Sequence, residues 1–236
     1  MTKQEFELKL KEICPWVDQT TFDKFEIYKQ TIQYHNKITN LSRLVSDELI
    51  YDQYFLSSLL PFTKLDYFIS NNNLKILDIG TGSGIPGIVL KIVFPNIQLT
   101  LIESNTKKCN FLKVLLNELN LHDVNLINDR CEICYKEHIE EFDIVTSRAV
   151  SSLDKILELS VAFAKISGHI ISLKSQNYLN EINEAKNVIS FFNVELINKI
   201  EYQFAEHMYV VLDFVKTKRT QDGYPRSWNK IINNPI

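Results

Sequence analysis

The chain has 236 residues, of which 45% are hydrophobic and 23% charged, so its composition is that of an ordinary globular protein with one sizeable core. No stretch reaches the roughly 18 uncharged apolar residues of a membrane helix, and the first residues lack the apolar centre of a signal peptide; we predict a cytoplasmic protein without membrane contact. A formal charge of -3 excludes nucleic-acid binding through bulk charge, so RNA binding would need a local basic patch.

From about residue 3 to residue 70 the apolar residues recur at helical spacing, as Phe22, Phe25 and Ile32 do. The polar run at residues 70–73 ends this pattern. We therefore predict a helical N-terminal section over residues 1–72.

Short β-type runs alternating with amphipathic helical stretches follow the polar run. The predicted strands cover residues 75–79, 98–102, 124–127, 142–147, 169–174, 194–200 and 208–215. Strand, helix, strand at this spacing is typical of an α/β fold whose parallel sheet is covered on both faces. Only a short polar stretch separates the last two strands, which favours a hairpin and one antiparallel strand at the end. This predicts a main domain at 73–216 and a basic tail at 217–236.

The first predicted strand ends in D-I-G-T-G-S-G-I-P-G, residues 78–87. The closely spaced Gly80, Gly82 and Gly84 allow a sharp turn and a close approach of the backbone to a ligand. Pro86 suits the first turn of a following helix. The glycine spacing alone also matches a dinucleotide-binding loop.

Two acids near the glycines bear on the choice of ligand. Asp78 puts a carboxylate at the strand end, which would repel a pyrophosphate but attract the ammonium of a methionine moiety. Glu103 follows the second strand, where an acid accepts hydrogen bonds from the ribose hydroxyls of an adenosine. Because NAD would use Glu103 equally well, it is Asp78 that favours S-adenosylmethionine over NAD.

Arg148 stands where the fourth predicted strand ends, in the sequence Thr146-Ser147-Arg148-Ala149. This position lacks both the Asn/Asp-Pro-Pro-aromatic loop used for amino methylation of adenine and the cysteine nucleophile used for pyrimidine carbons. An acceptor that needs no deprotonation remains, and the lone pair of guanine N7 qualifies. Arg148 is then a candidate catalytic residue that donates to the guanine O6/N7 edge or to the carboxylate of the cofactor.

Cys131 and Cys134 form a C-x-x-C pair after the third predicted strand. Zinc normally needs two further ligands at suitable spacing, and an iron–sulfur cluster of the radical type needs three clustered cysteines, which this sequence lacks. We therefore predict no metal.

These motifs resemble the bacterial 16S rRNA guanine-N7 methyltransferases of the glucose-inhibited division protein B family. Residues 34–41, Y-H-N-K-I-T-N-L, are similar to the family's W-N-K-x-x-N-L-T, and residues 78–87 are similar to D-V-G-T-G-x-G-x-P-G. The resemblance continues through residues 147–149 and 173–174 and covers nearly the whole chain.

The resemblance implies a Rossmann-like class I methyltransferase fold that uses S-adenosylmethionine as methyl donor. The substrate would be a guanine in the decoding-region loop of 16S ribosomal RNA, taken as naked RNA or in the 30S subunit, and we expect a monomer. The positions that fall on the family's cofactor-binding residues are Gly80, Ile85, Cys131, Glu132 and Arg148.

The chain departs from the family pattern at three places. Residues 53–58 read Q-Y-F-L-S-S where the family commonly has R-H-x-x-D-S, so Tyr54 and Ser57 replace a histidine and an aspartate. Ser175 replaces the glycine of L-K-G, and residues 224–230 match the basic tail only in part. These departures concern substrate contacts rather than the cofactor.

The predicted RNA phosphate contacts are cations outside the cofactor motif. They are Lys37, Lys174 and a C-terminal basic patch that runs from Lys216 to Lys230 and includes Lys218, Arg219 and Arg226. Two other readings stay open: a non-catalytic RNA-binding protein that retains the methyltransferase fold, and a nicotinamide-dependent dehydrogenase.

Overall fold

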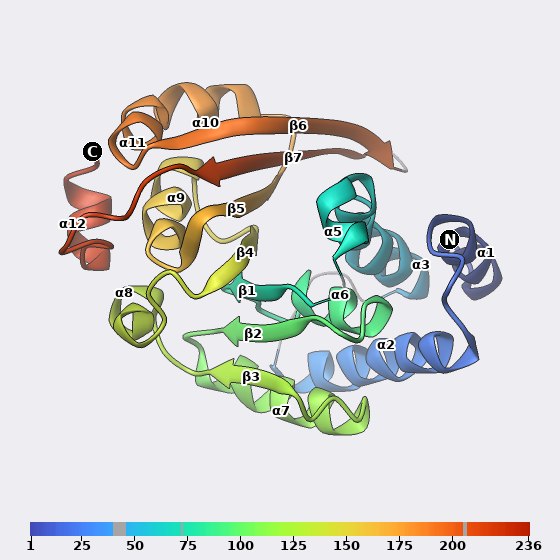
Figure 1. The fold of residues 1–236 in the computed structure, drawn as a ribbon. Helices are drawn as coiled ribbons and strands as arrows, with labels where there is room; N and C mark the ends of the chain where they lie inside the picture. Colours follow the sequence, from blue (N-terminus) through green and yellow to red (C-terminus); the bar gives the residue numbers. More distant parts are fainter. Residues whose placement is uncertain (40–45, 72, 205–206) are drawn as a thin grey trace. The chain divides into compact units, whose positions relative to one another are not determined.

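The computed structural model describes residues 1–39, 46–71, 73–204 and 207–236 (Figure 1). The chain divides into two compact units, one made of Met1–Leu74 and Thr81–Asn128 and the other of Lys75–Gly80 and Asp129–Ile236. Within the described ranges, no helix has both the length and the apolar character needed to cross a membrane. The three-part division at residues 72 and 216 stays a prediction.

The first unit begins with the predicted helical section and continues into alternating strands and helices. Its elements are α1 (Lys3–Ile13), α2 (Gln19–Thr39), α3 (Asp47–Leu49), the π-helix η1 (Ile50–Leu56), α4 (Ser57–Leu59), the 3-10 helix η2 (Phe62–Lys64), α5 (Asp66–Ser70), α6 (Gly87–Val93), β2 (Gln98–Ile102), α7 (Thr106–Glu118) and β3 (Val124–Ile127). The helical prediction for the N-terminal section is confirmed over its described residues. Strands β2 and β3 pair in parallel, as the helical stretch between them predicts.

Buried aromatic rings hold the helical section together. The ring of Phe6 stacks on Tyr51 at 4.8 Å and meets Phe25 edge-on at 5.2 Å. Phe55 lies 4.8 Å from Phe25 and 5.0 Å from Tyr28, so α1, α2 and η1 share one aromatic core. Each such pair adds about 0.5–1.5 kcal/mol beyond the area it buries. This core fixes α2 within the first unit.

The second unit contains the other strands. Its elements are β1 (Lys75–Ile79), α8 (Cys131–Cys134), the 3-10 helix η3 (Tyr135–Glu137), β4 (Phe142–Arg148), α9 (Leu153–Val161), β5 (Ala164–Lys174), α10 (Tyr178–Glu184), α11 (Lys186–Phe191), β6 (Val194–Phe204), β7 (His207–Lys216) and α12 (Trp228–Asn233). Residues 201–204 belong to the stretch that was expected to connect the last two strands, but they pair with β7. Ladder hydrogen bonds use only the backbone, so polar side chains do not stop a strand whose face is open to water.

The strands form one mixed sheet of seven in the order β3-β2-β1-β4-β5-β7-β6. β1, β4 and β5 are parallel, whereas β7 runs antiparallel to both of its neighbours, β5 and β6. The prediction of a mostly parallel sheet with an antiparallel last strand is therefore confirmed. β7 lies between β5 and β6 in the sheet, and the order of the elements along the chain did not indicate this position.

Lys216 was predicted to belong to the basic surface patch, and this prediction is wrong. Its side chain is fully buried, and its ammonium donates to Glu140 Oε1 at 2.8 Å and to the carbonyl oxygens of Val161 and Ala164 at 2.8 and 2.9 Å. Burial lowers the pKa of Lys216, and the Glu140 carboxylate opposes this shift. Lys216 therefore ties the end of β7 to the starts of β4 and β5.

Replacing Lys216 by methionine should lower the free energy of unfolding by about 3–5 kcal/mol, because Glu140 and two buried carbonyls then lose their donor. Urea denaturation measures this loss. Lys218→Met removes the same charge from an exposed side chain two residues away and serves as the control. Equal losses in the two variants would contradict the assigned role of Lys216.

Candidate functional site

The glycine loop adopts the sharp turn that its sequence predicts. Gly82 and Gly84 have φ values of +62° and +97°, and Gly80, which belongs to the second unit, has +64°. A Cβ on Gly84 would lie 2.5 Å from Ile88 Cδ1 and 2.8 Å from Tyr28 Oη. Both conformation and space therefore require glycine at position 84. A helix follows the loop as predicted, but α6 begins at Gly87, so Pro86 is its N-cap residue and lies one position before the first turn.

Glu103, which follows β2, binds the glycine loop through its carboxylate. The side chain is 6% exposed; its Oε2 accepts from the Gly82 N–H at 3.0 Å and its Oε1 accepts from the Asn105 N–H at 2.8 Å. Its backbone oxygen accepts from Asn128 Nδ2 at 3.0 Å. Because each carboxylate oxygen has two lone pairs, Glu103 keeps acceptor capacity for hydroxyl groups of a ligand.

Tyr28 supports the same loop from α2. Its hydroxyl donates to the Ser83 carbonyl at 2.7 Å, and its side chain is fully buried. The sequence places Tyr28 only at apolar helical spacing, which gives no sign of this contact. The structure thus adds a loop-positioning residue from the helical section to those predicted.

In the second unit, the parallel pairing of β1 with β4 brings three predicted residues to one sheet edge. Asp78 lies opposite Thr146, so Gly80 and Arg148 follow at the carboxyl ends of neighbouring strands. Asp78 is fully buried, and Arg148 is half-buried. Burial raises the pKa of Tyr202, and the positive charge of Arg148 opposes this rise.

Helix α8 carries Cys131 and Glu132, the remaining predicted cofactor residues of the second unit. Cys131 is buried, and the Glu132 carboxylate lies 4.0 Å from the guanidinium of Arg130. Burial, reinforced by the charge of Asp129, raises the pKa of the Cys134 thiol to about 11. A redox-active C-x-x-C lowers a thiol pKa instead, so Cys134 has the property of a structural cysteine. Over the described part of the chain, no cluster of three or more His, Cys, Asp or Glu side chains is arranged to hold a metal ion.

The predicted cofactor residues are divided between the two units. The first unit holds Gly82, Gly84, Ile85 and Glu103, and the second holds Asp78, Gly80, Cys131, Glu132 and Arg148. The contacts above connect Gly82 with Glu103, and the β1–β4 register connects Asp78 with Arg148. Their role in binding a cofactor stays a prediction.

The cations predicted to contact RNA fall into two groups: some are exposed, and others already donate to acceptors within the protein. Lys37, Lys218 and Arg219 are exposed. The Lys174 ammonium donates to Glu181 Oε2 at 2.7 Å and to the Ser151 carbonyl at 2.9 Å. The Arg226 guanidinium donates to both carboxylate oxygens of the buried Glu158 at 2.7 Å and to the Asn234 carbonyl at 2.8 Å, so its charge already stabilises the C-terminal segment.

The departure at residues 53–58 lies inside the first unit. Tyr54, Ser57 and Ser58 are buried, and the Ser57 hydroxyl donates to the Gln53 carbonyl at 2.7 Å. Tyr54 lies on η1, whereas Ser57 and Ser58 lie on α4, which follows it directly. Residues 40 and 41, the last two of the motif at 34–41, lie outside the described residues.

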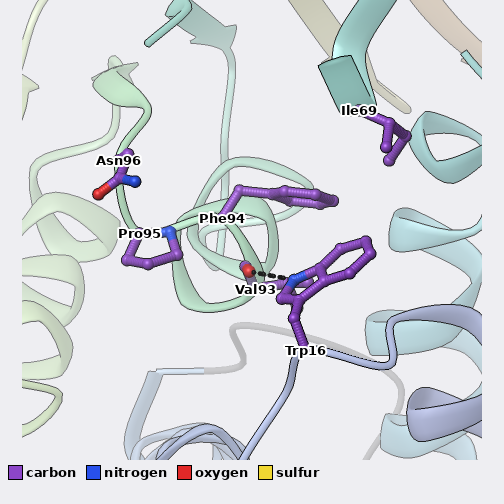
Figure 2. A pocket seen from close by; sticks show the side chains of 6 residues that line it. All are labelled: Trp16, Ile69, Val93, Phe94, Pro95 and Asn96. Carbon is purple, nitrogen blue, oxygen red and sulfur yellow. Dashed lines mark hydrogen bonds between the residues drawn. The ribbon is translucent and has the colours of Figure 1, made fainter. Parts of the chain in front are cut away.

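A cavity of about 420 Å³ in the first unit contains none of the predicted residues (Figure 2). It is lined by Trp16, Ile69, Val93, Phe94, Pro95 and Asn96. The Trp16 indole N–H donates to the Val93 carbonyl at 3.1 Å, and Asn96 precedes β2. The cavity therefore lies at the opposite end of β2 from Glu103.

Gly84→Ala should destabilise the protein more than Gly223→Ala, by about 1–3 kcal/mol in the free energy of unfolding, because the new methyl group overpacks the loop. Gly223 has a φ of +88° and open space where a Cβ would stand, so it controls for the backbone strain alone. Urea denaturation compares the two variants. Equal destabilisation would show that Ile88 and Tyr28 give way at no cost.

Comparison of the sequence and the fold with known proteins identifies the family of this chain. Residues 21–208 match the family model described as rRNA small subunit methyltransferase G. Proteins named ribosomal RNA small subunit methyltransferase G are 48% identical in Ureaplasma parvum serovar 3, over 100% of both chains, and 45% identical in Malacoplasma penetrans, over 96% of each. The solved structure of M. jannaschii TYW2 in complex with AdoMet shares the fold with a TM-score of 0.53 and 21% identity, over 68% of this chain and 77% of that one. The chain belongs to the rRNA small subunit methyltransferase G family.

Proposed function

We propose that this protein transfers a methyl group from S-adenosylmethionine to N7 of a guanine in 16S ribosomal RNA. The observation that carries the proposal is the 48% identity over the full length to a relative named as a small-subunit rRNA methyltransferase. On this proposal the protein works in the cytoplasm, as a monomer, on naked 16S rRNA or on the 30S subunit.

The first unit provides groups suited to the adenosine half of the donor. The Glu103 carboxylate, oriented by two backbone N–H groups, accepts from the ribose hydroxyls. Gly82 and Gly84 keep side chains out of the space beside the loop. From the second unit, Cys131 and Glu132 on α8 are proposed for the adenine side.

The second unit provides groups suited to the charged half. The buried Asp78 carboxylate attracts an ammonium, directly or through water, and would repel a pyrophosphate. Arg148, at the end of the neighbouring strand, donates to the carboxylate of the cofactor or to the O6/N7 edge of the guanine. A positive group beside a negative one favours a zwitterionic methionine moiety over NAD.

The reaction needs positioning more than proton transfer. S-adenosylmethionine supplies the methyl group from its sulfonium, and the guanine N7 lone pair forms the new C–N bond as the C–S bond breaks and its electron pair stays on sulfur. Because N7 carries no proton at neutral pH, the chain needs no general base. We assign to Arg148 and Asp78 of the second unit the orientation of the reactants in line, which is the main source of the rate.

Purified protein should transfer label from S-adenosylmethionine to 16S rRNA, and Arg148→Ala should lower kcat/KM by about 100-fold through loss of a positioned donor. The assay uses naked rRNA and 30S particles that lack the modification. Lys186→Ala, which removes an exposed charge from the same unit, should leave the rate unchanged. A rise in KM for S-adenosylmethionine alone would assign Arg148 to the cofactor. The absence of label from both substrates, despite RNA binding, would contradict the proposal and favour a binding-only protein.

S-adenosylmethionine should raise the thermal midpoint of the protein, whereas NAD should not, because only a ligand that binds the native state stabilises it. Glu103→Gln should weaken S-adenosylmethionine binding by about tenfold or more, since a charged acceptor is lost. Unfolding without ligand controls for the Glu103 contacts to Gly82 and Asn105. Stabilisation by NAD instead would favour the dehydrogenase reading.

A further inference from the structure

A second hollow, of about 320 Å³, lies wholly within the second unit. Residues of η3 and of the loop 219–224, which follows β7, line it together with Ala162, which precedes β5. It therefore lies by the amino ends of β4 and β5, whereas Arg148 ends β4. A seven-residue strand spans roughly 20 Å, so this hollow is distinct from the proposed methyl-transfer site.

Two cationic side chains border the hollow. Lys136 and Arg219 both line it and are exposed, and neither has a hydrogen bond or an ion pair within the described residues. Lys216 and Arg226 in the same part of the chain are, in contrast, fully engaged with Glu140 and Glu158. Cations that the fold does not use and that border a hollow favour an anionic ligand.

Acidic groups near the hollow reduce this charge only in part. Asp222 lines the hollow. Glu140 interacts electrostatically with Arg219, but its carboxylate already accepts from Lys216 at 2.8 Å and from the Thr220 N–H at 3.3 Å. The exposed Lys218 adds a further cation next to Arg219.

Aromatic rings border the same space. Tyr135 and Tyr224 line the hollow and are half-buried. The Tyr224 ring is held edge-on by Phe191 and Phe192, each with ring centroids 5.2 Å away. A ring held in this way beside cations suits a stacked nucleobase with its phosphate, the mode by which proteins bind unpaired RNA. The volume, at the lower end for ligand pockets, fits one nucleotide unit.

We propose that this hollow binds one unpaired nucleotide of the RNA substrate, with its phosphate on Lys136 and Arg219 and its base beside Tyr135 or Tyr224. The inference rests on the proposed function and deepens it by naming a docking site remote from the methylated guanine. The site contributes to RNA affinity and leaves the cofactor untouched.

The first test measures binding of the full chain to a fluorescent single-stranded 16S rRNA fragment by anisotropy over a salt series. Lys136→Ala/Arg219→Ala should weaken binding by about tenfold or more and reduce the slope of log affinity against log salt by about 1.5, as the loss of two phosphate contacts requires. Lys113→Ala/Lys186→Ala removes two exposed charges elsewhere and is the matched control. Equal effects of the two pairs, or none, would overturn the proposal.

The second test separates stacking from charge. Tyr135→Leu should weaken RNA binding by about fivefold or more while leaving the salt slope unchanged, because stacking releases no counterions. Stabilisation by free GMP, together with no change in RNA affinity for any variant, would assign the hollow to a free nucleotide and overturn the RNA proposal. Thermal shifts with S-adenosylmethionine should be the same for all variants.

These measurements distinguish failure of this inference from failure of the proposed function. Wild-type protein that binds RNA through the hollow but transfers no methyl group would refute only the activity. Normal RNA affinity and normal KM for RNA in the Lys136→Ala/Arg219→Ala variant would refute only the docking site.

Discussion

A buried carboxylate is costly unless donors surround it, and Glu103 meets this constraint with the backbone of the glycine loop itself. Its Oε2 accepts from Gly82 and its Oε1 from Asn105, so the end of β2, the loop and the start of α7 form one hydrogen-bonded group. The shape of the loop and the orientation of the acid are therefore set together. A ligand that bonds to Glu103 meets a site whose geometry already exists before binding.

The helical section contributes to this site through Tyr28. The aromatic core around Phe55 fixes α2, and α2 directs the Tyr28 hydroxyl at Ser83 on the loop. The departures at Tyr54 and Ser57 lie in the same core, where they affect packing rather than a surface. The N-terminal section is thus a structural support for the loop in the first unit.

Much of this architecture was predictable from local patterns. The strands at 75–79, 98–102 and 124–127 agree with the structure residue for residue, because each is a short run rich in apolar residues between breaks in the pattern. The positive φ of Gly82 and Gly84 also follows from residue type. The contacts across the sequence were not predictable: nothing in the periodicity shows that Tyr28 reaches Ser83, or that 201–204 extend a hairpin.

The basic C-terminal patch shows why charge in a sequence is an incomplete guide to binding. Lys216 and Arg226 appear equivalent to Lys218 and Arg219 along the chain, yet the first pair neutralises the carboxylates of Glu140 and Glu158. Whether a cation serves the fold or a partner depends on acids about 70 residues away or more in sequence, which only tertiary structure brings near.

Methyl transfer to guanine N7 of 16S rRNA is established by the chemical identity of the product. 16S rRNA methylated by the purified protein would be digested to nucleosides for mass spectrometry and, in parallel, cleaved by borohydride and aniline, which cut at 7-methylguanosine. We expect 7-methylguanosine as the new nucleoside and one cleavage position in a loop. A methyl group on an exocyclic amine, a ribose or a pyrimidine would contradict it.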